Sequence, residues 1–188
     1  MLANNLNKIK KFMANKSKKS KNKKPIVVAV SGGFDPLHVG HVRMFREAKK
    51  HGDKLVVILN NDNWLKKKKG FAFMPEKERK ELIRHIKWVD DVVLTGHKPN
   101  DSDRSVCREL HKLKPHVFAN GGDRKLDNIP EVAVCEKHGI KMVFNIGHGG
   151  KIQSSSWLLN SYMGEAACIC GSGKKYKDCH GKKKKSKK

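Results

Sequence analysis

Short apolar runs alternate along the chain with longer segments of helical periodicity. The apolar runs predict five strands, at 26–31, 55–60, 92–95, 117–120 and 142–146. Between them, apolar positions recur every three or four residues, which predicts helices near 41–50, 75–89, 102–113 and 130–138, and a last helix from about Ser154. Strands that are apolar throughout and alternate with helices indicate a parallel sheet covered on both faces. We therefore expect an α/β fold with a Rossmann-like, doubly wound, five-stranded parallel sheet.

Charge divides the chain into a folded part and two basic ends. The 188 residues carry a formal net charge of +24 at pH 7. Residues 1–24 hold nine Lys and no acidic residue, and residues 168–188 hold nine Lys and one Asp. We expect an arm that does not fold at 1–24, one domain at 25–163, a small C-terminal module at 164–181 and a Lys-rich tail at 182–188.

The basic ends suggest partners but do not identify them. Lys-rich segments attract polyanions through a salt-dependent attraction that ignores sequence, so nucleic acid, the ribosome or an acidic protein are candidates. A solvated tail that only aids solubility is the alternative. No run approaches the roughly 18–20 apolar residues of a membrane span. The five cysteines are too unevenly spread for a disulfide framework, which indicates a reducing, cytoplasmic location.

The first predicted strand runs into Ser-Gly-Gly-Phe-Asp-Pro-Leu-His-Val-Gly-His at 31–41. In an open α/β sheet, ligands bind at the carboxyl ends of strands, where the next helix offers unpaired N–H groups to an anion. His38 and His41 are three residues apart, so they share one helix face and can both donate hydrogen bonds to a phosphate. Three glycines leave room for a close approach of the ligand: Gly32, Gly33 and Gly40.

Residues 33–41 resemble the signature of the cytidylyltransferase-like nucleotidyltransferases with an HxGH motif. That superfamily includes glycerol-3-phosphate cytidylyltransferase and the adenylyltransferase domain of ADP-heptose synthase, and the resemblance extends over residues 25–160. It implies an enzyme that transfers a nucleotidyl group from CTP or ATP to a phosphorylated sugar or alcohol and releases pyrophosphate. It also leads us to expect a homodimer.

The resemblance implies a set of site residues. His38 and His41 would hold the α- and β-phosphates, Lys68 would belong to a mobile basic loop at 66–69 that closes on the triphosphate, and Arg79 would add charge from a helix. The nucleotide-binding residues implied by the matching motifs are Gly32, Gly33, Phe34, Asp35, Gly40, Gly122, Asp123, Ser154, Ser155 and Ser156. The positive or Thr residues that often precede the family's Ser-Thr-Thr motif are absent, although Lys151 could replace their charge, so CTP and ATP both stay open.

Mg²⁺ is the expected cofactor of such a reaction. It would be held chiefly by triphosphate oxygens and water, as is usual for this ion. Asp35 and Asp123 would orient the metal–phosphate complex or substrate hydroxyls. The alternative function is an adaptor that keeps the nucleotide-binding fold and docks nucleic acid, the ribosome or an acidic protein through its basic ends. The intact pair of histidines favours the enzyme.

The C-terminal module carries the spacing C-x-C-x₈-C-H, formed by Cys168, Cys170, Cys179 and His180. Three thiolates and one imidazole complete a closed tetrahedral Zn²⁺ site. The segment closely resembles the SEC-C motif. A module this short cannot bury a core, so the metal would supply folding free energy on the order of 10–16 kcal/mol. Because no coordination position is open, we expect a chain that lacks 168–188 to keep its turnover and to lose partner binding.

Overall fold

A computed structural model of the protein describes residues 24–121, 129–147 and 153–182. Its strands form one parallel sheet in the order β3-β2-β1-β4-β5. The strands are β1 (Val27–Gly32), β2 (Lys54–Leu59), β3 (Asp91–Leu94), β4 (Val117–Gly121) and β5 (Lys141–Ile146). Every strand boundary lies within one residue of its predicted position, and the predicted fold class is confirmed. The chain changes direction across the sheet between β1 and β4, which is where open α/β sheets place their ligands.

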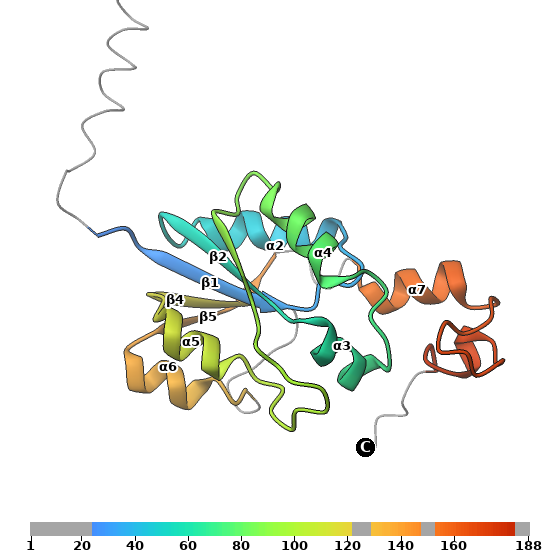
Figure 1. Ribbon diagram of the computed structural model, residues 1–188. Helices are drawn as coiled ribbons and strands as arrows, with labels where there is room; N and C mark the ends of the chain where they lie inside the picture. The colour runs from blue at the N-terminus through green and yellow to red at the C-terminus, as the bar shows by residue number, and fades with distance from the viewer. Residues whose placement is uncertain (1–23, 122–128, 148–152, 183–188) are drawn as a thin grey trace, which may run out of the picture.

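Helices cover both faces of this sheet (Figure 1). Helices α2 and α4 lie on one face and α5 and α6 on the other, while α3 and α7 stand beyond the carboxyl ends of the strands. Their bounds are α2 (Val39–Lys49), α3 (Asp62–Lys69), α4 (Glu76–Arg84), α5 (Cys107–Leu113), α6 (Val132–His138) and α7 (Ser155–Met163), followed by the short 3-10 helix η2 (Tyr176–Asp178).

Alternation along β1 divides the core into two layers. Val28 and Val30 are fully buried against Phe45 of α2 and Ile83 of α4, whereas Ala29 faces the opposite layer. That second layer includes Leu110 of α5 and Cys135 of α6. Since burying one Val or Leu side chain stabilises a fold by about 1.5–3 kcal/mol, the two layers fix the sheet on which the site is built.

Three predictions about helices and loops need correction. The helix predicted at 75–89 ends at Arg84, after which the backbone forms single turns. The segment 66–69 is not a loop, because α3 begins at an N-cap where Oδ1 of Asn61 accepts the N–H of Trp64 at 3.0 Å. The helix ends at Gly70, whose φ of +89° suits a left-handed C-cap. Helix α5 starts at Cys107 and not near 102, because the carboxylates of Asp101 and Asp103 accept backbone N–H groups two residues further on. Such local bonds compete with helix formation.

The predicted basic arm and tail lie almost wholly outside the described residues. Within 24–121, 129–147 and 153–182, no helix is long and apolar enough to cross a bilayer.

Candidate functional site

A cavity of about 550 Å³ opens at the carboxyl ends of β1 and β4. It is bounded by the turn that follows β1, the start of α2, the last turn of α3 and the first turn of α7. Its size falls in the usual range for small-molecule sites. The lining brings together eleven of the residues implied by the sequence: Gly32, Gly33, Phe34, Asp35, His38, Gly40, His41, Lys68, Ser154, Ser155 and Ser156. Two further residues predicted to bind the nucleotide, Gly122 and Asp123, lie outside the described residues.

The two histidines form a stacked pair at the start of α2. Their ring centroids are 3.6 Å apart with an interplanar angle of 22°. His38 is the N-cap, and its Nδ1 accepts the N–H of Gly40 at 3.1 Å. Nδ1 of His41 accepts the N–H of His38 in return, at 3.3 Å. This reciprocal capping box fixes both rings with the backbone of the helix end itself.

The capping bonds also determine what each ring can offer to a ligand. In a neutral imidazole one nitrogen accepts and the other carries the proton, so acceptance at Nδ1 leaves Nε2–H as the donor. Burial lowers the pKa of His38. Burial, followed by the charges of His38 and Lys69, lowers the pKa of His41 from 6.5 to about 3. At neutral pH the pair therefore presents two neutral N–H donors.

Two glycines make this arrangement sterically possible. A Cβ on Gly40 would lie 3.0 Å from the ring of His38, and a Cβ on Gly32 would lie 2.8 Å from the ring of Phe34. Phe34 has a φ of +49° and packs edge-on against His41, with 4.9 Å between centroids. The glycines expected for close ligand approach thus also admit the side chains that shape the cavity.

Helix α3 brings lysines to the cavity. Nζ of Lys68 lies 4.5 Å from the ring centroid of Trp64. Nζ of Lys69 donates to the carbonyl oxygen of Asp35 at 2.7 Å and lies 3.7 Å from its carboxylate. Burial is the strongest of several influences on Lys69, and it lowers the pKa of that group. The positive charge expected from a mobile loop is instead carried by an ordered helix.

Arg79 does not reach the cavity from its helix. Its side chain is fully buried, and it donates to carbonyl oxygens of Gly33, Asn60 and Met74 at 2.6–2.8 Å. Its Nη2 also pairs with the carboxylate of Asp62 at 2.6 Å. The guanidinium holds the turn after β1 to the end of β2 and is not part of the cavity lining, and its expected contact with phosphates stays a prediction.

Asp35 is likewise occupied by the protein. It is buried, and its two carboxylate oxygens accept the N–H groups of Phe73 and Met74 at 3.0 and 2.7 Å. It therefore joins the His turn to the segment before α4. Each oxygen thus already accepts one backbone N–H, and the metal-orienting role expected from the sequence stays a prediction.

The three serines meet the His turn at the N-terminus of α7. Oγ of Ser154 caps the helix by accepting the N–H of Trp157 at 3.2 Å. Oγ of Ser155 donates to the carbonyl oxygen of Pro36 at 2.9 Å, which joins segments 119 residues apart in the chain. A helix N-terminus and three hydroxyl groups thus face the same space as the histidines.

Several lining residues were not predicted. Arg43 stands three residues after Gly40, and that helical spacing was the available signal. Asn120 is buried at the end of β4, and its Nδ2 has no hydrogen-bond partner among the residues that the structure describes. A buried donor of this kind is costly unless a ligand or water satisfies it. Gln153 also lines the cavity, whereas Lys69, a further lining residue, belongs to the basic segment 66–69 that was expected there.

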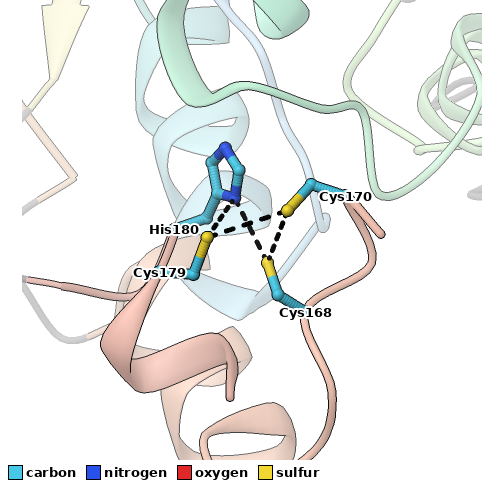
Figure 2. Close-up of side chains that lie close together, drawn as sticks. All are labelled: Cys168, Cys170, Cys179 and His180. Atoms are coloured by element: carbon cyan, nitrogen blue, oxygen red, sulfur yellow. Dashed lines mark hydrogen bonds between the residues drawn. The ribbon is translucent and has the colours of Figure 1, made fainter. Parts of the chain in front are cut away.

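The four predicted metal ligands converge at the C-terminus (Figure 2). We call residues 166–182 the zinc knuckle. Its donor atoms all lie within 4.8 Å of one another, with separations of 3.2–3.7 Å between the bonded pairs. Donors of a tetrahedral zinc lie about 3.3–3.8 Å apart, so the set fits that ion. The N–H of Cys170 is the main cause that lowers the pKa of the Cys168 thiol to about 6, towards the thiolate that binds metal.

Comparison with known proteins gives two family matches and a group of relatives. Residues 29–145 match the family model described as cytidylyltransferase-like, and residues 166–182 match the SEC-C motif. FAD synthase of Pyrococcus abyssi is 42% identical over 103 residues, which cover 54% of this chain and 66% of the relative. FAD synthase of Thermoplasma volcanium is 32% identical over 140 residues, which cover 73% of this chain and 94% of the relative.

A solved structure adds to this comparison. The crystal structure of the lipopolysaccharide core biosynthesis protein from Thermoplasma volcanium has 30% sequence identity and a TM-score of 0.56. The match covers 67% of this chain and 100% of that one.

Proposed function

Because the chain belongs to the cytidylyltransferase-like family, we propose that it is a nucleotidyltransferase that transfers the adenylyl group of ATP to FMN. The products would be FAD and pyrophosphate. The observation that carries the proposal is the stacked, neutral pair of His38 and His41 in the cavity beside the sheet's switch point. The choice of ATP and FMN is supported by the FAD synthases among the relatives. FMN is itself the phosphate ester of an alcohol, the class of acceptor predicted from the sequence.

The proposed chemistry needs positioning and charge neutralisation more than covalent help from the protein. A phosphate oxygen of FMN attacks the α-phosphorus of ATP in line. A bond forms between that oxygen and phosphorus, and the bond from the α-phosphorus to the bridging oxygen of pyrophosphate breaks. Nε2–H of His38 and of His41 would donate to the phosphate oxygens on which negative charge develops.

Neighbouring elements would complete the site. Lys68 and Lys69 bring positive charge from α3, and the N-terminus of α7 brings N–H and hydroxyl donors. The apolar lining contributed by Met44, Trp64 and Leu65 suits a flat ring system. Mg²⁺ would be held chiefly by the triphosphate itself and would neutralise part of its charge.

The test is a matrix of nucleotides and acceptors. ATP and CTP are each supplied with FMN, glycerol 3-phosphate and a heptose phosphate, and both pyrophosphate and the coupled product are measured. We expect ATP with FMN to give FAD. Turnover with CTP or a sugar phosphate in place of that pair would redirect the proposal to another acceptor class.

A histidine variant then tests the site itself. His41→Ala should lower turnover by about 10²–10³, because it removes one donor to the developing charge. His51→Ala, an exposed histidine just after α2, serves as the matched control and should leave turnover unchanged. Equal activity in the two variants would exclude the histidine pair from the reaction.

Other partners stay predictions. Binding of the basic ends to nucleic acid, the ribosome or an acidic protein, the homodimer, and the cytoplasmic location are tested by none of the contacts described above. Salt-dependent binding to RNA would support the adaptor alternative if no NTP and acceptor pair gave turnover.

A further inference from the structure

The zinc knuckle packs directly against the end of the basic helix α3. A Cβ on Gly70 would lie 2.0 Å from Nε2 of His180, so this imidazole rests on the bare backbone of the helix C-cap. The next residue, Phe71, packs edge-on against His180 and Tyr176, with centroid separations of 5.5 and 5.9 Å. Phe71 is itself only 8% exposed. These contacts join positions more than 100 residues apart in the chain.

The knuckle is also continuous with α7. Leu159 of that helix is buried in the same apolar cluster as Phe71, Cys168 and Tyr176, with Met163 packed beside it. The N–H of Lys177 donates to the carbonyl oxygen of Gly164 at 3.0 Å, directly after the helix. Figure 1 shows α7 and the knuckle, in orange and red, beside the end of α3.

Helices α3 and α7 also contribute residues to the lining of the nucleotide cavity. Lys68 and Lys69 line it from the last turn of α3, immediately before Gly70. Ser154 lines it from the first turn of α7, whose far end carries Leu159 and Met163. We propose that the docked zinc knuckle is a clamp that holds the lysines of α3 and the serine end of α7 at the spacing that the nucleotide phosphates require. Phe71 and Gly70 are the positioning residues of this clamp.

His180 connects the metal to the clamp. Its Nδ1 faces the sulfurs of Cys168 and Cys179 at 3.2 and 3.3 Å, while Nε2 faces Gly70. The orientation of a ligating histidine ring is set by the metal on one nitrogen and by the group next to the other nitrogen. Metal bound at Nδ1 would therefore aim the imidazole at the C-cap of α3. The clamp predicts the opposite of the expectation drawn from the sequence, that loss of residues 168–188 would spare turnover.

The test compares two C-cap glycines that differ in what an added Cβ would meet. Gly70→Ala and Gly139→Ala both place a side chain at a helix C-cap with positive φ, at +89° and +63°. The new Cβ collides with His180 at position 70, whereas nothing lies within 4 Å at position 139. Both changes strain a left-handed C-cap, so Gly139→Ala controls for the strain of that kind, and a collision with His180 occurs only at position 70.

The readouts are the zinc content, the hydrogen exchange of residues 62–69 without ligand, and the dissociation constant of MgATP, all on the full chain. In Gly70→Ala we expect one zinc per chain to be retained, exchange in α3 to rise, and ATP affinity to fall by about tenfold. Gly139→Ala should show neither change. Equal exchange in α3 and equal ATP affinity in the two variants would overturn the clamp.

A second variant guards against a folding failure. Phe71→Ala removes the ring between the knuckle and α3 but leaves the four metal ligands and the cavity-lining residues unsubstituted, and should reproduce the effects of Gly70→Ala. Unchanged ATP affinity in a folded Phe71→Ala protein would contradict the proposal. The clamp rests on the proposed function only for its effect on ATP. If the wild type makes no FAD from any tested pair and α3 still loosens in both variants, the proposed reaction fails while the docking stands.

Discussion

The cavity at the sheet, proposed to bind a nucleotide, and the zinc knuckle both gather polar groups, but these groups are held in place differently. The cavity stands on a sheet whose first strand places Val28, Ala29 and Val30 in full burial, and its histidines are fixed by backbone bonds. In the knuckle, residues 166–182, only Cys168 and Tyr176 are buried. The sheet thus shapes its site by burial, whereas the knuckle depends on its metal and on docking.

The two sites also differ in charge, as their ligands require. Burial lowers the pKa of His41 to about 3, so this ring meets an anion as a neutral donor. The N–H of Cys170 lowers the pKa of Cys168 to about 6, so that side chain meets a cation as a thiolate. One shift removes a charge from the apolar environment and the other creates a charge for a metal. In the proposed reaction, positive charge for the phosphates would come from the lysines of α3.

Removal of one metal ligand should produce the largest difference in stability between the knuckle and the sheet. Cys170→Ser leaves three of four ligands, and metal binding of this type is worth on the order of 10–16 kcal/mol to the folding of a zinc module. We expect the knuckle to lose zinc and its exchange protection, while amides of β1 and β2 stay protected. Cys107→Ser, a cysteine outside the cluster, is the control. Simultaneous loss of protection in the sheet would show that the two regions fold as one unit.

Loss of the buried Arg79 guanidinium should destabilise the fold around the cavity. Arg79→Met leaves the Asp62 carboxylate and three carbonyl oxygens without their donor. Removing one partner from a buried ionic network costs about 3–5 kcal/mol, to be measured by urea unfolding. Lys77→Met, on the exposed side of α4, should change the unfolding free energy little. A small change in unfolding free energy at position 79 would mean that the turn after β1 keeps its conformation without the Arg79 hydrogen bonds.

Acid should weaken the cavity through His41. Its pKa is about 3 in the folded protein and 6.5 in the unfolded chain, so the unfolded chain binds the proton first as pH falls. The stabilisation is fully present above pH 6.5 and is lost as pH falls towards 3. Between pH 7.5 and 5 the unfolding free energy should drop by about 2 kcal/mol more in the wild type than in His41→Gln. Parallel pH profiles would show that His41 titrates normally in the folded state.

The sequence predicted local features well. Strands such as Val27–Gly32 are short, apolar and bounded by turn residues, so their positions follow from the pattern alone. The histidine pair was found because both rings and the helix end lie within four residues, and the metal ligands because all four lie within the 13 residues 168–180. The start of α3 was missed, although Asn61 before it and Gly70 after it are ordinary cap residues.

Long-range contacts were beyond sequence reasoning. The family resemblance placed Arg79 and Asp35 at the phosphates and the metal. Because charged side chains are rarely buried, nothing in the sequence indicated that each satisfies backbone groups from other segments. The docking of His180 on Gly70 depends on how the chain returns after more than 100 residues. No pattern within either segment indicates it.

The most direct test of the central claim observes the two imidazoles themselves. Side-chain ¹H–¹⁵N spectra of histidine at pH 7, recorded on the full chain with His41→Gln for assignment, report the protonated nitrogen of each ring. We predict that His38 and His41 are neutral with the proton on Nε2, and that both Nε2 signals shift when MgATP is added without FMN. A proton on Nδ1, a charged ring, or signals that stay unmoved at saturating MgATP would contradict the account.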